Sequence, residues 1–393
     1  MQTRRFGKTN LRTTVLTFGA MRIPPAADEP EAAARERAFA TLRRALDVGI
    51  NHIETARGYG LSETFIGDAI QQRVIQRKEF ILTTKIPPTE TADEFRRALD
   101  DSLVRLRTDH VDVLDIHGIN TDELLELTLR PGGTLKAVRR AINEGLVGHL
   151  GFSTHGPLET IIRCIETNEF ETVNLHYYFF NQRNRPAVEL AAAKDMGVFI
   201  ISPTDKGGQL FKAPAKLKAL CAPRTPIEFN QRWLLAQPEV HTLSLGAATP
   251  EEFDAHLRGA DQEGPLKSIE SDVASRLQDA LESLAPTYCS FCHECLPCPE
   301  DVHIPEILRL RNLALALDMV EFGRYRHGMF VRRDPETGEP TGGAGHWFPG
   351  RQGDWCTDCG KCLPRCPLKL DIPALLRDAH ERLSGREGRR LWK

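Results

Sequence analysis

Several features that would narrow the function at once are missing from this sequence of 393 residues. The formal net charge is only −3, and no basic stripe is interleaved with aromatic residues, so the composition argues against a nucleic-acid partner. No apolar run approaches the length that crosses a bilayer, and the segment Met1-Gln-Thr-Arg-Arg-Phe-Gly lacks the apolar core of a signal peptide. We therefore expect a cytoplasmic protein that does not bind membranes.

Cysteine is scarce outside two C-terminal runs. The chain has 10 cysteines, and all but two of them fall between residues 289 and 366. A secreted protein would use them for disulfides, but crowded cysteines in a reducing compartment indicate metal binding. Cys164 and Cys221 belong to neither run, and Cys164 lies in an apolar helical pattern that is typical of a core residue.

Strand and helix patterns alternate regularly through the first two thirds of the chain. After a small hairpin at residues 4–16, the expected strands are 16–21, 51–53, 80–84, 111–116, 148–152, 172–175, 198–202 and 241–245. Eight strand–helix units in this length predict an α/β fold, a closed (β/α)8 or TIM barrel. We expect the barrel domain to span residues 1–284 with a linker helix at 268–284, and a second domain to span residues 285–393.

Polar side chains follow three successive predicted strands. Glu54 ends one strand, with Tyr59 five residues later between two glycines; Lys85 ends the next strand, and His117 ends the one after that. In a parallel barrel these positions share the rim where the βα loops carry out the chemistry. Each residue also has a structural interpretation, since Tyr59 could sit in a plain turn, Lys85 on the surface and His117 at a strand cap.

This combination suits the reduction of a carbonyl group. A phenol has a pKa of about 10, and a neighbouring ammonium is expected to lower the pKa of Tyr59 so that it can donate a proton. Glu54 would hold the Lys85 ammonium in place, and His117 would hydrogen-bond the oxygen on which charge develops.

The segments Arg5-Phe-Gly-Lys-Thr-Asn and Glu54-Thr-Ala-Arg-Gly-Tyr-Gly60, with Lys85 and His117, resemble the aldo-keto reductases over about seven tenths of the chain. The resemblance implies a barrel that binds NADPH, or less often NADH, and a catalytic tetrad of Glu54, Tyr59, Lys85 and His117. The family has aspartate where this chain has Glu54. The extra methylene keeps the charge but moves it, so the geometry of the pairing with Lys85 is open at this point.

The same resemblance implies a set of cofactor-binding positions. They are Ser153, Thr154, Asn174 and Tyr177 at the nicotinamide; Lys206, Gly207, Gly208 and Leu210 in the loop after the seventh strand; and Gly246 and Glu252 after the eighth. Glu252 and His256 stand where the family has Gln and Asn against adenine. No Lys or Arg lies between Gly246 and His256, although a 2′-phosphate normally binds one, so the choice between NADP and NAD stays open.

The two cysteine runs have the spacing of iron–sulfur proteins. The later run, Cys356-Thr-Asp-Cys359-Gly-Lys-Cys362-Leu-Pro-Arg-Cys366-Pro367, is C-x2-C-x2-C-x3-C-P, in which three thiolates bind one cubane and the fourth binds the other. The earlier run has one residue fewer before its last cysteine. Zinc is the alternative metal. Zinc sites, however, use two C-x2-C pairs that lie apart in the sequence and do not need three such spacings in succession.

This spacing predicts two [4Fe-4S] clusters with crossed ligation. The expected ligand sets are Cys289, Cys292, Cys295 and Cys366 for one cluster and Cys298, Cys356, Cys359 and Cys362 for the other. A predicted helix, Ile304 to Phe322, separates the runs and favours a mainly α-helical ferredoxin-like domain. The whole chain resembles aldo-keto reductases fused to such a domain.

Three functions stay open, an enzyme and two kinds of interaction protein. The first is an NAD(P)H-dependent oxidoreductase that interconverts a small carbonyl and an alcohol, whose clusters relay electrons to a redox partner or only stabilise the fold. Nicotinamide delivers two electrons as hydride and a cubane accepts one at a time, so the two halves need an intermediary. The second is a nucleotide-binding redox sensor with little turnover, and the third is a cluster protein that uses the barrel for docking.

Overall fold

The computed structural model describes residues 1–260, 262 and 264–385. The chain divides into two compact units, one of Met1–Gly207 with Asn230–Pro265 and one of Gly208–Phe229 with Leu266–Lys393. The expected boundary at residue 284 differs from this division, because Ser268–Glu282 clusters with the second unit. The reason is local: Arg276 of that helix donates to the backbone carbonyl of Leu220, and Arg224 pairs with Glu270.

The first unit contains a closed barrel of eight parallel strands, as the sequence predicts. In sheet order they are β10 (Thr242–Leu245), β3 (Leu16–Gly19), β4 (His52–Glu54), β5 (Ile81–Ile86), β6 (Val111–Ile116), β7 (Val147–Ser153), β8 (Thr172–Leu175) and β9 (Gly197–Ile200). Because all eight run in the same direction, their carboxyl ends form a single rim. The strands are almost entirely buried, as expected of a parallel sheet covered by helices.

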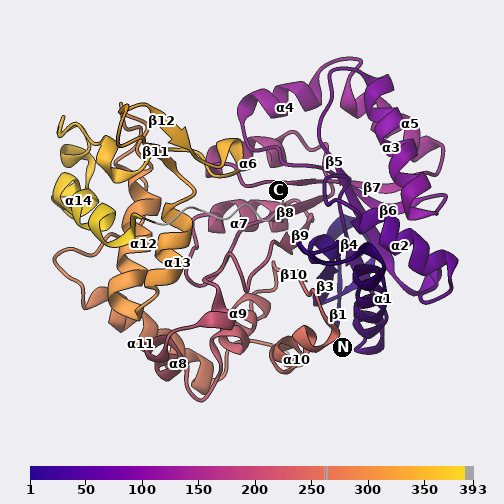
Figure 1. Ribbon diagram of the computed structural model, residues 1–393, viewed down its shortest axis with the longest axis horizontal. Helices are drawn as coiled ribbons and strands as arrows, with labels where there is room; N and C mark the ends of the chain where they lie inside the picture. Colours follow the sequence, from indigo (N-terminus) through magenta and orange to yellow (C-terminus); the bar gives the residue numbers. More distant parts are fainter. Residues whose placement is uncertain (261, 263, 386–393) are drawn as a thin grey trace. The chain divides into compact units, whose positions relative to one another are not determined.

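Helices surround the barrel strands (Figure 1). They are α1 (Glu31–Asp47), α2 (Ser62–Gln71), α3 (Ala92–Leu106), α4 (Asp122–Leu129), α5 (Thr134–Asn143), α6 (Leu158–Glu166), α7 (Arg185–Ala193) and α10 (Asp254–Ala260), while α9 (Pro226–Leu235) crosses the boundary between the units. Helix α3 shows why they form here: Thr91 and Glu94 make a reciprocal capping box, and Phe95 and Leu99 bury one face. The sequence interpretation missed α4.

The amino-terminal hairpin closes the barrel at the end opposite the carboxyl-end rim. Strand β1 (Thr3–Arg5) pairs with β2 (Arg12–Thr14), and Phe6 lies buried against the rings of His52 and His241. Gly7 has φ +56°, and a Cβ there would lie 2.3 Å from the backbone nitrogen of Gly197. Only glycine allows this close approach.

The second unit is mainly helical, as expected. It contains α8 (Ala215–Cys221), α11 (Ser268–Glu282), α12 (Ile304–Leu317), α13 (Val320–His327), α14 (Ile372–Leu383) and the hairpin β11 (Val331–Arg333) with β12 (Pro340–Gly342). The helix predicted from Ile304 to Phe322 is broken, because Asp318 adopts the left-handed conformation with φ +56° and ends α12. Inside α12, the buried carboxylate of Glu306 pairs with the guanidinium of Arg309 at 2.5 Å.

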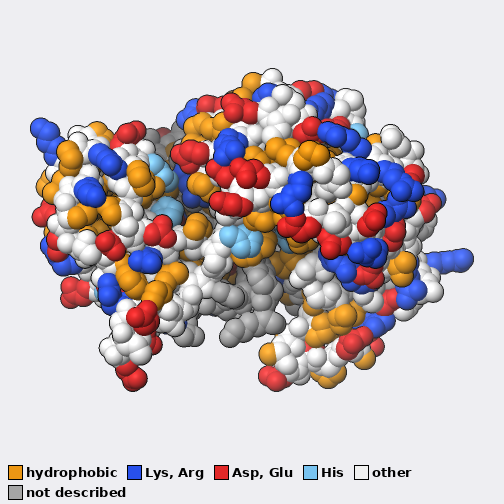
Figure 2. Space-filling model, turned by 90° about the horizontal axis from the view of Figure 1, so that it is seen from above, with side chains coloured by type: hydrophobic (Ala, Val, Ile, Leu, Met, Phe, Trp, Pro, Cys, Tyr) orange, Lys and Arg blue, Asp and Glu red, His pale blue; other side chains and the backbone are white. Residues whose placement is uncertain are grey.

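Acidic and basic side chains lie interspersed on the face shown in Figure 2. Throughout the described residues many acidic and basic side chains form ion pairs, for example Arg96 with Asp100 and Arg139 with Glu169. Among the residues that the structure describes, no helix is long and apolar enough to cross a membrane.

Candidate functional site

The four residues predicted as a tetrad meet at the carboxyl-end rim of the barrel. The ammonium of Lys85 forms an ion pair with Glu54 and donates to the carbonyl oxygen of Thr55 at 3.0 Å. Its nitrogen lies 5.2 Å from the centre of the Tyr59 ring. The Tyr59 ring meets the His117 ring edge to face, with centroids 5.7 Å apart. Strands β4, β5 and β6 are neighbours in the barrel, and this adjacency brings the four side chains together.

The structure explains how glutamate serves at a position where the resemblance implies aspartate. The second carboxylate oxygen of Glu54 accepts a hydrogen bond from the Ser244 hydroxyl at 2.9 Å. Gly19 on β3 leaves the space, since a Cβ there would lie 2.6 Å from the Ser244 oxygen and 3.0 Å from the Glu54 carboxylate. The longer side chain therefore keeps its pairing with Lys85 and gains a partner on β10.

Burial dominates the protonation of the site. It raises the pKa of Tyr59, and the charge of Asp115 raises it further, so the expectation that the phenol is more acidic than usual is wrong for this state of the site. Burial lowers the pKa of Lys85 to about 7, and the charge of Asp115 opposes that shift. The hydroxyl of Tyr59 is thus a weak acid until charge develops on a bound oxygen.

Asp115 is a charged member of the site that the sequence interpretation missed. It lies on β6, 1 % exposed, with its Cα paired to that of Lys85 on β5. Burial raises the pKa of its carboxyl to about 6, although Lys85 and Thr172 act in the other direction. The signal was present, because an aspartate interrupts the apolar strand Val111–Ile116 two residues before His117.

The side chains implied to bind the nicotinamide amide differ in whether they already have a hydrogen-bond partner within the protein. Asn174 is 3 % exposed, and its side-chain oxygen has no hydrogen-bond partner among the described residues, so it is poised to accept from a ligand. The Ser153 hydroxyl accepts from the Gly118 nitrogen at 3.1 Å. The Thr154 hydroxyl donates to the Ile119 carbonyl at 2.7 Å and is therefore already committed.

Tyr177 does not present its ring to the rim. It is buried against Trp233 of α9, and its hydroxyl donates to the Gln237 side chain at 2.8 Å. The resemblance implies that this ring stacks on the nicotinamide, and in the present geometry the ring packs against Trp233 instead.

The loop after β9 carries the positions expected to approach the pyrophosphate of the cofactor. Gly207 lies in the first unit, and a Cβ there would be 2.0 Å from the Pro203 carbonyl, so the turn requires glycine. The charge of Lys206 lowers the pKa of Lys85, which shows that the two ammonium groups act on each other. Gly208 and Leu210 belong to the second unit, where a Cβ on Gly208 would be 2.7 Å from the Met319 methyl.

Arg22, which lies outside the segment from Gly246 to His256, contacts the positions implied to bind the adenosine. Arg22, from the turn after β3, donates to the Gly246 carbonyl at 2.7 Å and pairs with the carboxylate of Glu252. Gln231 hydrogen-bonds His256, whose pKa burial lowers to about 4. No sequence signal points to Arg22, because more than two hundred positions separate it from Glu252.

A chain of hydrogen bonds at the ends of β7, β8 and β9 also escaped the sequence interpretation. His155 Nδ1 lies 2.5 Å from His176 Nε2, and His176 Nδ1 lies 2.5 Å from the Tyr178 hydroxyl. That hydroxyl donates to the Ile201 carbonyl at 2.5 Å. His176 directly follows β8, as His117 follows β6, and His155 lies two residues after the end of β7.

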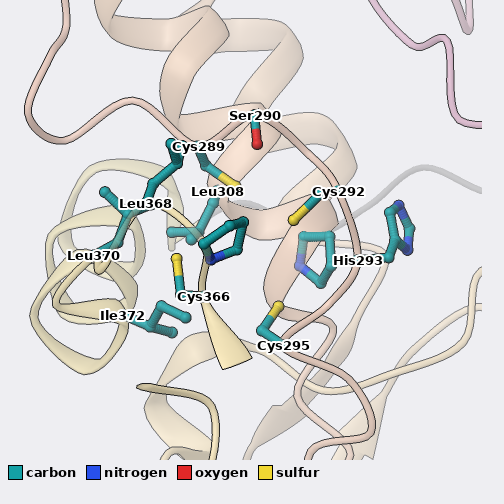
Figure 3. A pocket seen from close by; sticks show the side chains of 12 residues that line it. Cys289, Ser290, Cys292, His293, Cys295, Leu308, Cys366, Leu368, Leu370 and Ile372 are labelled. Carbon is teal, nitrogen blue, oxygen red and sulfur yellow. The ribbon is translucent and has the colours of Figure 1, made fainter. Parts of the chain in front are cut away.

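The eight clustered cysteines gather around two separate cavities in the second unit. Cys289, Cys292, Cys295 and Cys366 line one cavity with an empty volume of about 330 Å³, and Cys298, Cys356, Cys359 and Cys362 line the other, of about 370 Å³, which Cys295 also borders. Figure 3 shows the four sulfur atoms of the first set turned toward the same space, with Leu308, Leu368, Leu370 and Ile372 around them. Each set thus takes one cysteine from the distant run, as the crossed ligation predicts.

Burial governs the protonation of the cysteines that line these cavities. Burial raises the pKa of Cys295 to about 12 and also raises the pKa values of Cys289, Cys356 and Cys362. Within residues 1–260, 262 and 264–385, no three His, Cys, Asp or Glu side chains are close enough to hold a single metal ion. A cubane spreads its four thiolates over four iron atoms, which needs a wider arrangement than a single ion does.

Comparison with known proteins identifies the barrel. The sequence profile of the Aldo/keto reductase family matches residues 15–267. The chain belongs to this family. Methylglyoxal reductase DkgB of Escherichia coli O157:H7 is 31% identical over 263 residues, which cover 64% of this chain and 93% of that protein. L-galactose dehydrogenase of Arabidopsis thaliana is 28% identical over 219 residues, 53% of this chain and 66% of that protein.

Membership of this family makes the protein an oxidoreductase of the NAD(P)-dependent aldo/keto reductase type. Solved structures show the same fold. The holo form of aldo-keto reductase AKR11C1 from Bacillus halodurans superposes with a TM-score of 0.59 at 23% identity, covering 70% of this chain and 96% of that one. The family match ends at residue 267, before either cysteine run begins.

Proposed function

We propose that this aldo/keto reductase interconverts a small carbonyl compound and its alcohol at the rim formed by Glu54, Tyr59, Lys85 and His117. The observation that carries the proposal is the buried ion pair of Glu54 and Lys85 beside the Tyr59 ring. A buried pair of this kind is unfavourable to keep in a barrel core, and catalysis gives a reason to keep it.

The side chains supply proton transfer and charge stabilisation. A bound nicotinamide would exchange hydride with the carbonyl carbon. Tyr59 donates its proton to the carbonyl oxygen as charge develops there, and the Lys85 ammonium stabilises the resulting phenolate. His117 lies against the edge of Tyr59 and is placed to hydrogen-bond the same oxygen. Because the resting pKa of Tyr59 is high, the proton moves only when a polarised oxygen accepts it.

Two observations support a nicotinamide dinucleotide at this rim. The unpartnered side-chain oxygen of Asn174 suits the amide group of the nicotinamide, with Ser153 beside it on the neighbouring strand. At the other end, Glu252 suits a ribose 2′-hydroxyl, whereas Arg22 suits a 2′-phosphate. Since Glu252 holds Arg22 in an ion pair, we propose NADH as the better cofactor and NADPH as the weaker one.

The names of the relatives suggest a substrate class. They include a methylglyoxal reductase, an L-galactose dehydrogenase and a 6-dehydroglucose reductase from Novosphingobium aromaticivorans, which is 29% identical over 164 residues, 38% of this chain and 50% of that protein. We propose short polar aldehydes and sugar carbonyls as the substrates to test first.

The decisive experiment follows NADH and NADPH oxidation over a panel of such carbonyls with three proteins. The wild type should turn over at least one compound. Tyr59→Phe should lose activity by about 10²–10⁴-fold while its nucleotide affinity stays unchanged, because the hydroxyl acts mainly in the transition state. Tyr288→Phe, which removes a half-buried phenol of the second unit, is the matched control and should behave as the wild type. Full activity in Tyr59→Phe would refute the proposal.

We also propose that the second unit is a ferredoxin-like domain, residues 285–393, with two [4Fe-4S] clusters. The support is the C-x2-C-x2-C-x3-C-P spacing together with two cavities, each lined by the four cysteines that the ligation pattern assigns to one cluster, with Cys295 bordering both. A cluster in either cavity would accept or deliver one electron, and a redox protein is the partner that this chemistry suggests. Because Cys292 and Cys359 are exposed, each cluster would have one edge near solvent.

Anaerobic purification followed by iron and acid-labile sulfide analysis tests the clusters. We expect a brown protein with about eight irons and eight sulfides per chain. A colourless protein with stoichiometric zinc would contradict the assignment. Cytoplasmic location stays a proposal that follows from reduced, metal-bound cysteines.

A further inference from the structure

A second buried carboxyl group, that of Asp115, lies on the strand next to Lys85 on the side opposite to Glu54. In sheet order, β5 lies between β4 and β6, so Lys85 stands between Glu54 on one neighbouring strand and Asp115 on the other. Lys85 and Asp115 are each 1 % exposed, and their Cα atoms are register partners. Among the described residues Lys85 forms an ion pair with Glu54, whereas both carboxyl oxygens of Asp115 are buried without a hydrogen-bond partner. The catalytic role already assigned explains Glu54 but not this second buried carboxyl group.

The barrel is shaped to hold the Asp115 carboxyl group. On the next strand, β7, Gly151 is the register partner of Asp115. A Cβ at Gly151 would lie 2.2 Å from Asp115 Oδ1 and 2.0 Å from the Thr172 hydroxyl, so any other residue would displace one of these groups. The space that Gly151 leaves is therefore filled by a polar side chain in the middle of an apolar strand.

The charged groups around Asp115 decide what its proton does. From β5 it faces Lys85, whose partners are Glu54 on β4 and, electrostatically, Lys206 in the loop after β9. From β8 the hydroxyl of Thr172 lowers its pKa. Above it, on the rim, is Tyr59, on which the charge of Asp115 acts. His52 lies on β4, and burial lowers its pKa to about 3, so it is neutral and contributes no charge near neutrality.

We propose that Asp115 is a positioning residue that sets the acidity of Tyr59 by sharing the charge of Lys85. This inference rests on the proposed carbonyl chemistry and adds a residue to it. When Asp115 is ionised, its negative charge opposes formation of a phenolate at Tyr59. It also offsets the positive charge of Lys85, which would otherwise stabilise that phenolate. When Asp115 takes a proton from solvent, the charge of Lys85 is left to Glu54 and Tyr59, and the phenol becomes a stronger acid.

The direction of catalysis follows from the proton on Asp115. Reduction needs Tyr59 as an acid, so a protonated Asp115 favours it. Oxidation of the alcohol needs the phenolate as a base, and an ionised Asp115 makes that base stronger. The carboxyl titrates with a pKa of about 6, which places the change just below neutral pH.

The first test measures the acidity of Tyr59 without any cofactor. The chain has five tyrosines, and labelling them at the phenolic carbon with ¹³C gives five signals, of which the Tyr59 signal is assigned by Tyr59→Phe. In Asp115→Asn we expect the pKa of Tyr59 to fall by about one unit relative to the wild type. The matched control is Asp112→Asn: Asp112 is on the same strand but bonds the Leu82 nitrogen and pairs with Arg77, so it should leave Tyr59 unchanged. An unchanged Tyr59 in Asp115→Asn would overturn the proposal.

The second test is the pH profile of carbonyl reduction. For the wild type we expect kcat/KM to fall as the pH rises through about 6, and for Asp115→Asn we expect that break to vanish, with a rate at about pH 6.5 roughly threefold above the wild type. At higher pH the loss of the Lys85 proton, whose pKa is about 7, lowers the rate of both proteins. Retention of the break near pH 6 in the variant would contradict the proposal. If the wild type shows no turnover while the Tyr59 pKa still responds to Asp115, then the proposed function fails and the electrostatic role stands.

A stability profile checks the ionisation itself. The folded pKa of Asp115 is raised above its unfolded value, so its contribution to stability is full below about pH 4 and is lost as the pH rises through about 6. The melting temperature of the wild type should therefore drop between about pH 4 and pH 7 relative to Asp115→Asn, which has no such group. Parallel profiles of the two proteins would show that Asp115 does not titrate in this range and would overturn the proposal.

Discussion

Glu54 shows how a single residue departs from the pattern around it and is accommodated. The carboxylate reaches both the Lys85 ammonium and the Ser244 hydroxyl, in a space that Gly19 leaves open. A shorter acid cannot make both contacts from the same backbone position. The sequence showed the substitution, but Ser244 and Gly19 lie on other strands, so only the fold reveals their compensating role.

The first prediction is that Glu54→Asp lowers kcat/KM by about 10- to 100-fold, even though aspartate is the residue expected from the family. The physical reason is that the carboxylate withdraws from Lys85 or from Ser244. Steady-state kinetics measures the loss. Ser244→Ala is the control, and it should fall between the wild type and Glu54→Asp because it removes one partner and keeps the ion pair. A Glu54→Asp variant as active as the wild type would mean that Ser244 and Gly19 do not tune the site.

The ion pair of Arg22 and Glu252 bears on the choice between NADH and NADPH. Their ion pair neutralises a cation where a 2′-phosphate would bind, if the dinucleotide lies as the resemblance implies. The second prediction is that Glu252→Gln releases Arg22 and shifts the ratio of kcat/KM for NADPH over NADH upward by about tenfold. Glu251→Gln, on a neighbouring exposed carboxylate, is the control that changes the same net charge without touching Arg22. An unchanged ratio would place the adenosine elsewhere.

At the scale of elements, close approach between helices depends on glycine. Gly67 lies in α2, where glycine is normally unfavourable by about 1 kcal/mol, yet a Cβ there would lie 2.1 Å from the Arg105 carbonyl of α3. The third prediction is that Gly67→Ala lowers the free energy of unfolding by about 1–3 kcal/mol, because the two helices must separate. Urea denaturation measures this change. Gly58→Ala, where nothing lies within 4 Å, is the control and should be nearly neutral. A stabilised Gly67→Ala would show that the helices adjust freely.

Element positions followed well from hydrophobic periodicity, since apolar strands and amphipathic helices alternate with little ambiguity. The break at Asp318 did not, because the left-handed conformation of one aspartate between two apolar helical stretches has no periodic signal. Helix α4 and helix α14 were also missed. Asp115 was overlooked for a related reason: polar residues at strand ends indicate a rim site, and this residue lies inside a strand.

At the scale of the whole molecule, the sequence predicted a barrel followed by a metal-binding unit, and the chain folds into two compact units. The boundary could not be read from the sequence, because α8 and α11 join the second unit through tertiary contacts such as Arg224 with Glu270. The sequence predicted those residues of the candidate site that lie in a recognisable motif. It did not predict Arg22, Asp115 and Ser244, which come from segments far apart in the chain. Their roles depend on three-dimensional proximity alone.

The two compact units lead to a prediction about metal removal. Two bound clusters would add to the stability of the second unit, because ligands bound only in the folded state stabilise it. Calorimetry should therefore resolve two unfolding transitions. Anaerobic iron chelation should lower the melting temperature of the second unit and leave that of the barrel unchanged.

Variants of single cysteines sharpen this fourth prediction. Cys366→Ser removes a ligand from the cavity of Cys289, Cys292 and Cys295, so iron should fall from about eight to about four per chain while the other cluster persists. Cys221→Ala, a buried cysteine outside both cavities, should keep all the iron and is the control. Carbonyl reduction should survive in Cys366→Ser if the cluster only stabilises its own unit. Loss of the cluster that Cys356 and Cys359 bind, with the first cluster intact, would contradict the crossed ligation, because Cys366 lines only the first cavity.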